Sequence, residues 1–255
     1  MNKMTYLAFK DVDPLIRSYL DPPSILLLSE VNKHYLNALD KDRQIVNCIK
    51  YNFFDACING HKSIAEWLLS LEETHGKIDI HANYEGAFRS ACSEGHKSVA
   101  EWLISLEETH GKINIHAIDE GAFRWSCDNG HKSVAEWLLS LEETHGKINI
   151  HADNEYAFRL ACGNGHKSIA QWLLSLEETH GKINIHAIDE EAFRLACCYR
   201  HKSVSEWLLS LEETHGKINI HANDDQAFRW SCKNGHKSVA EWLLSLEETH
   251  GKIDK

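Results

Sequence analysis

Apolar and polar residues follow two helical spacings in turn along most of the chain. A first run places small and aromatic side chains at i, i+1, i+4 and i+5, on one side of a short helix: Ala87, Phe88, Ala91 and Cys92. A second run uses the spacing i, i+3, i+4 and i+7: Val99, Trp102, Leu103 and Leu106. Beyond Gly111, Ile113 and Ile115 alternate with polar residues. The pattern predicts a helix, a tight turn, a longer helix and an extended connector.

This pattern recurs at a fixed period. The tripeptide His-Lys-Ser begins at residues 61, 96, 131, 166, 201 and 236, a spacing of 35 residues. Periods in this range indicate stacked repeats, in which each unit packs on its neighbours and the stack presents a long surface. We therefore expect function to lie on a surface and not in a pocket.

The repeated unit resembles the ankyrin repeat over residues 51–255. Ala91 to His96 matches the family's Ala-Ala-x-x-Gly-His junction, and Val99 to Ile104 stands in place of its Ile-Val-x-x-Leu-Leu helix. The resemblance implies an all-α, ankyrin-type helix-turn-helix solenoid of six 35-residue units. The usual period is near 33, and here the second helix is expected to run on through Ser-Leu-Glu-Glu-Thr-His. The Ala-Phe-Arg variant looks most like the ankyrin repeats of large DNA viruses.

The first helix of each unit lacks the Thr-Pro opening of that family. Acidic or amide residues near its start are expected to cap it instead: Asp119, Asn154, Asp189 and Asp224. The turn before each His-Lys-Ser carries glycine, except in the fifth unit, where Arg200 replaces it. If the backbone keeps a positive φ there, Arg200 costs about 1 kcal/mol.

Residues 1–50 differ in composition from the repeats and predict three short helices that cap the solenoid. They also resemble an F-box, a motif that docks the Skp adaptor of cullin-type ubiquitin ligases. The residues that carry the implied adaptor contact are Leu15, Ile16, Leu20, Pro22, Ile25 and Leu26. The Leu-Pro that opens the motif is missing, and Tyr35 replaces its tryptophan. Adaptor docking and a purely capping role both stay open.

Composition narrows the class of partner. The formal net charge of −11 repels a polyphosphate backbone and argues against nucleic acid. No long apolar run predicts a membrane span, and the first residues lack a secretory signal. Six of the eight cysteines occupy one repeat position, too far apart to pair, so we expect reduced thiols and an intracellular, cytoplasmic or nuclear monomer.

Each unit contains Cys-x-x-x-His and a second histidine pair, such as His110 and His116. Zinc needs four ligands that converge at about 2.0–2.3 Å, whereas copied positions on stacked helices stand about 8–10 Å apart. We expect structural histidines, buried thiols and no metal or cofactor. No phosphate loop, nucleophile elbow or zinc-protease motif occurs, and the paired glutamates predict a solvated surface, so we do not expect an enzyme.

Differences between the copies point to a binding surface. Substitutions gather around the first helix, at positions that the family resemblance assigns to the partner-binding groove. The candidate residues are Gly86, Ser93, Glu94, Gly121, Asp128, Asn129, Tyr156, Gly163, Asn164, Glu191, Cys198, Tyr199, Gln226, Lys233 and Asn234. Trp125 and Trp230 also differ from their counterparts Leu160 and Leu195, and they predict either interface anchors or core packing.

Two classes of function remain. The first is a binding module that holds a protein in the groove and delivers it through the F-box-like segment to a ubiquitin ligase. The second is a structural or decoy repeat protein without ligase contact.

Overall fold

A computed structural model describes residues 53–253, and residues 1–52 and 254–255 lie outside the described part. The predicted N-terminal helices and the F-box-like residues therefore fall outside it. The chain divides into two compact units, residues up to 91 with 98–113, and residues 92–97 with 114–255.

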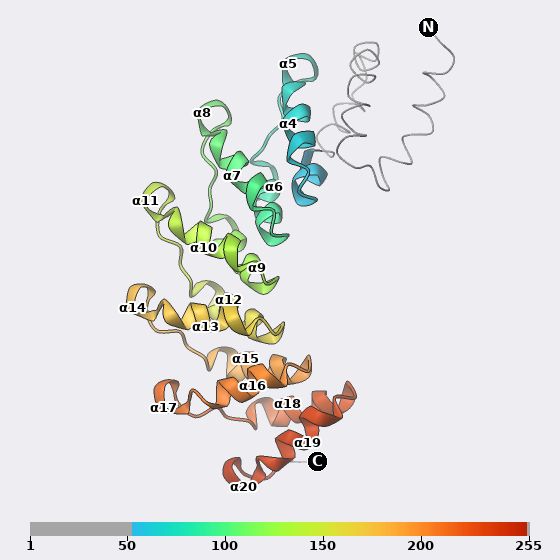
Figure 1. The fold of residues 1–255 in the computed structure, drawn as a ribbon, viewed down its shortest axis with the longest axis vertical. Coiled ribbons are helices and arrows are strands. Elements are labelled where there is room, and N and C mark those ends of the chain that lie inside the picture. Colours follow the sequence, from blue (N-terminus) through green and yellow to red (C-terminus); the bar gives the residue numbers. More distant parts are fainter. Residues whose placement is uncertain (1–52, 254–255) are drawn as a thin grey trace, which may run out of the picture. The chain divides into compact units, whose positions relative to one another are not determined.

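The described residues form helices joined by turns and short non-helical connectors and contain no strand, which confirms the all-α prediction. Each repeat has an inner helix, an outer helix and a short helix. In the first unit these are α4 (Lys62–Ser70), α5 (Glu72–His75), α6 (Ala82–Ser93), α7 (Lys97–Ser105) and α8 (Glu107–His110). In the second they are α9 (Ala117–Asp128), α10 (Lys132–Ser140), α11 (Glu142–His145), α12 (Ala152–Gly163), α13 (Lys167–Ser175), α14 (Glu177–His180), α15 (Ala187–Cys198), α16 (Lys202–Leu209), α17 (Glu212–His215), α18 (Ala222–Lys233), α19 (Lys237–Ser245) and α20 (Glu247–His250) (Figure 1).

The outer helices form because their apolar residues share one face. In α10, Val134, Ala135 and Leu138 are buried, and Trp137 is half-buried beside them. His131 precedes the helix and caps it through its main-chain carbonyl, which accepts hydrogen bonds from the amides of residues 134 and 135. Burial of this face therefore stabilises α10 more than capping by side chains does.

The second helix does not run on through Ser-Leu-Glu-Glu-Thr-His, so that prediction is wrong. In the repeat of α10, the helix ends at Ser140, and α11 begins after Leu141, whose amide bonds to the i−3 carbonyl of Leu138. The Ser140 hydroxyl donates to the carbonyl of Trp137 at 2.6 Å. Serine that bonds to a preceding carbonyl competes with the helical ladder, which explains the break.

The inner helices open with a left-handed turn that the sequence analysis did not anticipate. Ile118, Asp119 and Glu120 have φ of 56°, 51° and 62°, a conformation that costs non-glycine residues about 1–2 kcal/mol each. The Arg124 side chain stabilises the turn, because its Nε donates to the carbonyl of Asp119 at 2.6 Å and its Nη2 to that of Ile118 at 3.0 Å.

The predicted caps are therefore wrong. The residue before α9 is His116, which makes no side-chain capping bond, and Asp119 lies inside the left-handed turn. Its counterparts have the same conformation in the next three repeats: Asn154, Asp189 and Asp224. At three of these positions the main-chain carbonyl serves the turn, since Arg124, Arg159 and Arg194 donate to the carbonyls of Asp119, Asn154 and Asp189.

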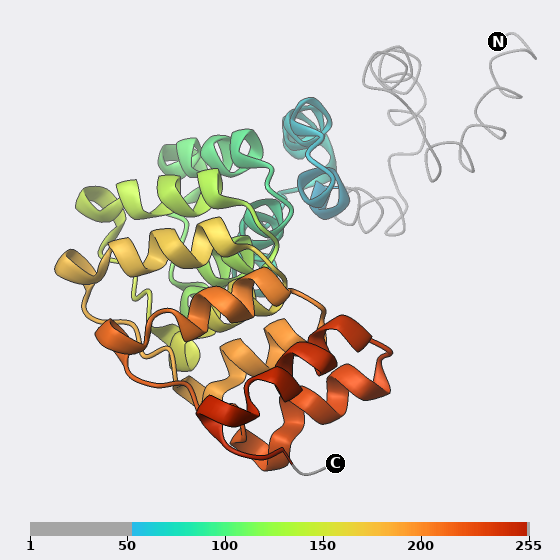
Figure 2. The ribbon, with the colours of Figure 1, turned by 60° about the horizontal axis from the view of Figure 1, so that its bottom comes forward.

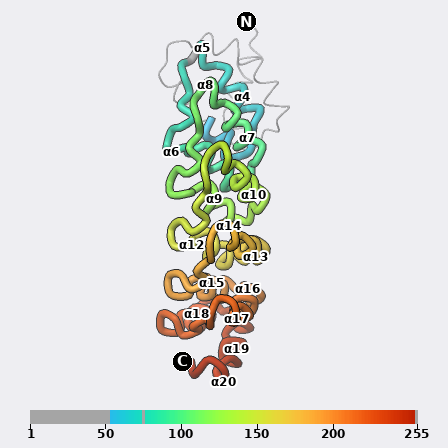
Figure 3. The backbone as a smooth tube through the Cα atoms, turned by 90° about the vertical axis from the view of Figure 1, so that its left-hand side faces the viewer, coloured from blue at the N-terminus to red at the C-terminus, as the bar shows by residue number. Residues whose placement is uncertain are grey.

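Within the second unit the repeats stack in two columns. The inner helices α9, α12, α15 and α18 pack on one another, and the outer helices lie beside them in a second column (Figures 2 and 3). Phe123, Phe158 and Phe193 are fully buried between them. Each of these rings packs on a tryptophan of the next repeat, with centroids 6.3–6.4 Å apart. The core is thus one continuous layer between the columns.

The glycine turns behave as the sequence predicts. Gly165 has φ 81°, and a Cβ there would lie 2.4 Å from Nδ1 of His201 in the next repeat. Arg200 keeps a positive φ of 70°, so the condition on which the expected strain in the fifth unit depends is met. Glycine is needed both for its backbone freedom and for the room that it leaves to the following histidine.

The repeated cysteines are unpaired, and five are buried: Cys57, Cys92, Cys127, Cys162 and Cys197. Burial raises the pKa of the Cys197 thiol to about 12. These thiols pack as small apolar groups and do not ionise. Cys232, the sixth copy, is exposed.

Candidate interaction surface

The structure sorts the predicted groove residues into two sets. The first set directly precedes Ala-Phe-Arg and lies between neighbouring inner helices, buried at the glycines and half-buried at the others: Gly86, Gly121, Tyr156, Glu191 and Gln226. The second set lies at the turn between inner and outer helices. In this set Ser93 and Asp128 are half-buried, and Gly163 and Cys198 are buried. The other members are exposed: Glu94, Asn129, Asn164, Tyr199, Lys233 and Asn234.

The larger side chains of the first set bind the arginine of the preceding repeat. Arg159 pairs with Glu191, and Arg194 donates from Nη1 to the Gln226 side-chain oxygen. Where the position is tyrosine, Arg124 instead pairs with Asp153 at 2.6 Å. These arginines are buried. Variation at this position therefore serves the contact between repeats. Little of these side chains stays accessible to a partner.

Tyr156 shows how strongly this position is engaged. Its ring lies 4.7 Å from the guanidinium carbon of Arg124 and 5.8 Å from that of Arg159. Its hydroxyl donates to Asp128 at 3.3 Å. Burial, and next the charge of Asp128, raise the pKa of Tyr156. The tyrosine is thus a bridge between α9 and α12.

The exposed turn residues form a row with partly fixed side chains. The Asn164 amide donates to the main-chain carbonyl and the carboxylate of Asp128, at 3.0 and 2.7 Å. The Asn234 amide donates to the carbonyl of Cys198 at 3.2 Å. Tyr199 occupies the same position in the repeat between them and is 51% exposed. The row is therefore a preorganised polar edge that carries one aromatic ring.

An apolar strip lies beside this row, one helical turn earlier on each inner helix of the second unit. It consists of Trp125, Leu160, Leu195 and Trp230. The first three are half-buried, and Trp230 is 42% exposed. From the sequence, Trp125 and Trp230 predict either interface anchors or core packing, because core residues flank both positions. Residues i and i+4 share a helix face, which is why Trp125 lies beside Asn129.

Two exposed isoleucines were missed. Ile118 and Ile188 stand in the left-handed turns with φ of 56° and 50°, and both are more than two-fifths exposed. β-Branched residues rarely take positive φ. No signal in the sequence marked these positions, because the left-handed turn depends on arginine contacts that form only in the folded repeat.

The second histidines hold each repeat together. His151 bonds through Nδ1 to the Glu155 carboxylate at 2.9 Å and through Nε2 to the carbonyl of His180 at 2.9 Å. Both partners are acceptors, so the arrangement favours the protonated imidazole, which donates from both ring nitrogens. Glu155 also accepts from the amide of Asn184 at 3.1 Å. This arrangement, here called the charged clamp, joins the left-handed turn to the following connector.

The clamp shifts the titration of its histidine. Burial alone would lower the pKa of His151, but the hydrogen bonds to His180 and Glu155 outweigh it and raise the pKa above its ordinary value. His81, His116 and His186 show the same direction for the same causes. These rings have structural partners on both nitrogens, as the sequence analysis expected of histidines in the repeat.

Residues 53–253 show neither a metal site nor a membrane-spanning helix. Within that range no group of three or more histidine, cysteine, aspartate or glutamate side chains is arranged to hold a metal ion. The helices described there are too short or too polar to span a bilayer.

Comparison with known proteins places the repeats. The family model described as ankyrin repeats (3 copies) matches three overlapping stretches, residues 90–189, 123–216 and 158–254. A solved structure of an ankyrin repeat family protein from Legionella pneumophila is similar at 24% identity over 77% of this chain and 69% of the other, with a TM-score of 0.41. No curated protein matches.

Proposed function

Because the chain belongs to the ankyrin repeat family, we propose that it is a non-catalytic module that binds a protein across the inner-helix face of its second unit. Ankyrin repeats generally act as protein-interaction modules, and no catalytic domain is indicated. The binding surface combines the apolar strip with the exposed turn residues beside it: Asn129, Asn164, Tyr199 and Asn234.

The observation that carries this proposal is the apolar strip itself. Large aromatic side chains that are partly exposed on a rigid support are the usual anchors of protein interfaces. Trp125 and Trp230 stand on α9 and α18, whose backbones are held by stacking on α12 and α15. A partner that covers the strip would bury two tryptophans without reordering the scaffold.

Charge along the opposite edge of the inner helices favours a basic partner. The left-handed turns expose Asp119, Asp189 and Asp224, and the buried arginines behind them are already paired within the repeats. We expect a partner segment with apolar side chains for the strip and basic side chains for this edge. Its association rate should fall as ionic strength rises.

Site-specific photo-crosslinking tests the location of the surface. A photoreactive phenylalanine is placed at Asn164 or Tyr199 on the inner face, and at the exposed outer-helix positions Glu136 or Gln171 as matched controls. The proposal expects one discrete covalent adduct between the chain and its protein partner from each inner position, and no adduct from the outer positions. Equal crosslinking at all four positions, or crosslinking from the outer helices alone, contradicts it.

A second, more specific proposal concerns residues 1–50. These residues lie outside the part that the structure describes, so this proposal rests on their sequence alone. Their F-box-like pattern supports docking to a Skp-type adaptor, so that the bound protein is delivered to a ubiquitin ligase. A pull-down should recover the adaptor with the full chain and lose it when residues 1–45 are deleted. Absence of the adaptor from both preparations favours the structural or decoy alternative.

A further inference from the structure

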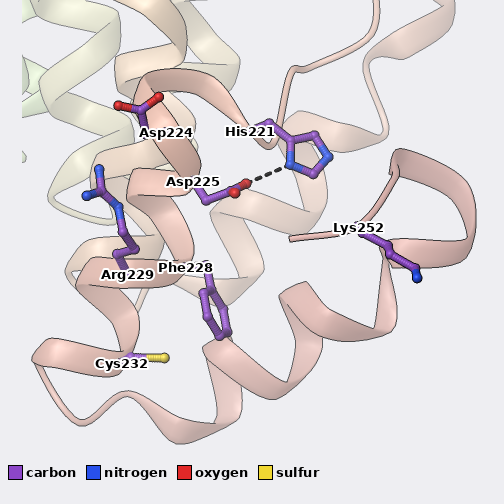
Figure 4. Close-up of a pocket in the computed structure, with 7 residues that line it drawn as sticks. All are labelled: His221, Asp224, Asp225, Phe228, Arg229, Cys232 and Lys252. Atoms are coloured by element: carbon purple, nitrogen blue, oxygen red, sulfur yellow. Dashed lines mark hydrogen bonds and ion pairs between the residues drawn. The ribbon is translucent and has the colours of Figure 1, made fainter. Parts of the chain in front are cut away.

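Arg200 is an exposed arginine whose side chain has no partner among residues 53–253. The other arginines of this range belong to the repeated Ala-Phe-Arg and donate to carbonyls of the left-handed turns. Figure 4 shows the last of them, Arg229. Arg200 donates only through its main-chain amide, to the carbonyl of Cys197 at 3.2 Å. Its guanidinium is therefore available to a binding partner.

Arg200 also stands in a strained turn of a fully stacked repeat. The equivalent residue is glycine in the other five units, with φ between 72° and 86°, and Arg200 keeps this conformation with φ 70°. An L side chain adopts it only at a cost in free energy, and strained residues cluster at ligand contacts. The inner helix α15 packs on both α12 and α18. Arg200 thus stays exposed although both neighbouring repeats are in place.

Tyr199 provides apolar surface beside this cation. Its side chain is 51% exposed at the end of α15. Leu195 of the apolar strip lies one helical turn earlier on the same helix face and is half-buried. Tyrosine and arginine are enriched among the residues that carry most of the binding energy of protein interfaces. The pair therefore has the composition of an interface anchor.

The turns around Arg200 lack a carboxylate that could neutralise it. In the fourth, fifth and sixth units, residues 163–167, 198–202 and 233–237 contain no aspartate or glutamate, whereas the second and third units carry Glu94 and Asp128 there. Glu206 pairs with Lys202, one helical turn earlier, at 3.5 Å. An exposed guanidinium without a counter-ion favours an anionic partner, and its planar donors match a carboxylate.

We propose that Arg200 and Tyr199 determine the specificity of the inner-helix surface for a protein segment that carries an aspartate or glutamate. The carboxylate pairs with the Arg200 guanidinium, and a neighbouring apolar side chain packs on Tyr199 and Leu195. Because these residues lie on the proposed binding surface, the proposal rests on that function and adds the chemistry of the partner. With basic side chains at the left-handed turns, the bound segment carries opposite charges at the two ends of the inner helices.

A library of random peptides displayed on phage supplies the probe, and the full chain is the bait. The enriched peptides are synthesised with a dye, and their affinity for the chain is measured by fluorescence anisotropy. A second version of each peptide replaces the acidic residue by its amide, and a third replaces it by lysine. The proposal expects enrichment of aspartate or glutamate, and a loss of affinity of about tenfold for the amide version.

Variants of the chain locate the contact. Arg200→Gly should weaken binding of the acidic peptide about tenfold. This variant relieves the strained turn, so unfolding cannot explain the loss, and urea unfolding checks its stability. Arg200→Glu should bind the lysine peptide better than the acidic one. Lys237→Glu is the matched control, because it makes the same change of net charge on the outer helix α19, at a side chain that is 84% exposed. It should keep the preference for the acidic peptide.

Three outcomes overturn the proposal: no saturable binder in the library, equal affinity for the acidic and amide peptides, or equal affinity of the acidic peptide for the unaltered and Arg200→Gly chains. A photoreactive phenylalanine at Asn164 separates this failure from that of the proposed function. A peptide that crosslinks there but binds Arg200→Gly equally well refutes the role of Arg200 and leaves the surface in place. A bound peptide that does not crosslink there lies elsewhere, which contradicts both proposals.

Discussion

The charged clamp makes stability depend on pH, and Glu155→Gln tests this. Glu155 is 7% exposed and accepts bonds from both His151 and the amide of Asn184. Glutamine keeps the shape but removes the charge that favours a protonated His151. Hydrogen bonds to charged groups contribute about 1.5–3 kcal/mol. A neutral His151 can still accept from the new amide, so we expect a loss near the lower end, about 1.5 kcal/mol below pH 6.5.

The sign of the pH effect follows from the direction of the pKa shift. The pKa of His151 is raised in the folded chain, so its contribution is full below the ordinary histidine pKa of about 6.5 and is lost as pH rises through the higher folded value. Above that point the His151 lone pair faces the Glu155 carboxylate. Glutamine removes this repulsion, so the penalty of Glu155→Gln should shrink as the pH rises to about 9.

The pKa values of some other histidines are shifted in the opposite direction. Their effect on stability must be separated from that of the charged clamp. Burial lowers the pKa of His131 and of His201, so these residues favour the folded state as pH rises toward and past their unfolded value. The difference between the unaltered chain and Glu155→Gln cancels them, because both chains contain them. Glu178→Gln removes the same charge from an exposed position of the same repeat and should change stability by less than about 0.5 kcal/mol.

Urea unfolding followed by far-ultraviolet circular dichroism at pH 6.5 and 9 provides the global measurement. Hydrogen exchange of the Asn184 amide, corrected for the intrinsic rate, provides the local one, since this amide donates to Glu155. Repeat proteins need not unfold in a single step, so the global free energy of unfolding is compared with the local protection of the Asn184 amide. If Glu155→Gln destabilises the chain equally at both pH values, His151 is not protonated in the clamp and the reasoning fails.

Three further substitutions test the stack by thermal or urea unfolding. Gly165→Ala should cost about 1–3 kcal/mol more than Gly235→Ala, because both have positive φ but only Gly165 faces a histidine ring of the next repeat; equal losses would refute the steric part. Arg200→Gly should raise stability by about 1 kcal/mol, and a decrease would show that its side chain makes a compensating contact. Trp172→Ala should cost about 3 kcal/mol and broaden the transition more than Trp242→Ala in the last described repeat; two equally sharp transitions would contradict nearest-neighbour coupling.

Local chemistry was enough to predict the helix hairpin. The outer helix follows from apolar residues at helical spacing, which place Val134 and Leu138 on the buried face of α10. The turn follows from Gly165 and its copies, since few other residues take positive φ at low cost. Even the exception at Arg200 was predictable, because the 35-residue period imposes the same backbone on every copy.

The candidate surface was only half predictable. Sequence variation marked Glu191 and Asn164 alike, yet Glu191 is engaged by the arginine of the preceding repeat and Asn164 is exposed. Variation reports that a position is free to change, and it does so equally for a contact between repeats and for a contact with a partner. The role of the strip at Trp125 needed the inner helices to be placed side by side.

The left-handed turn was decided by side-chain contacts that the pattern of apolar and polar residues does not show. Ile118 is β-branched and disfavours positive φ, and aspartate such as Asp119 takes it as a single residue and not in a run of three, so the sequence fits an ordinary helix start. The conformation is stable because the Arg124 side chain binds two carbonyls of the turn while His116 and Glu120 close it from the other side. Periodicity determines which faces are buried, whereas the strained backbone depends on the side chains of Arg124 and His116, which further contacts hold in place: Arg124 pairs with Asp153 of the next repeat, and His116 bonds to the carbonyl of His145.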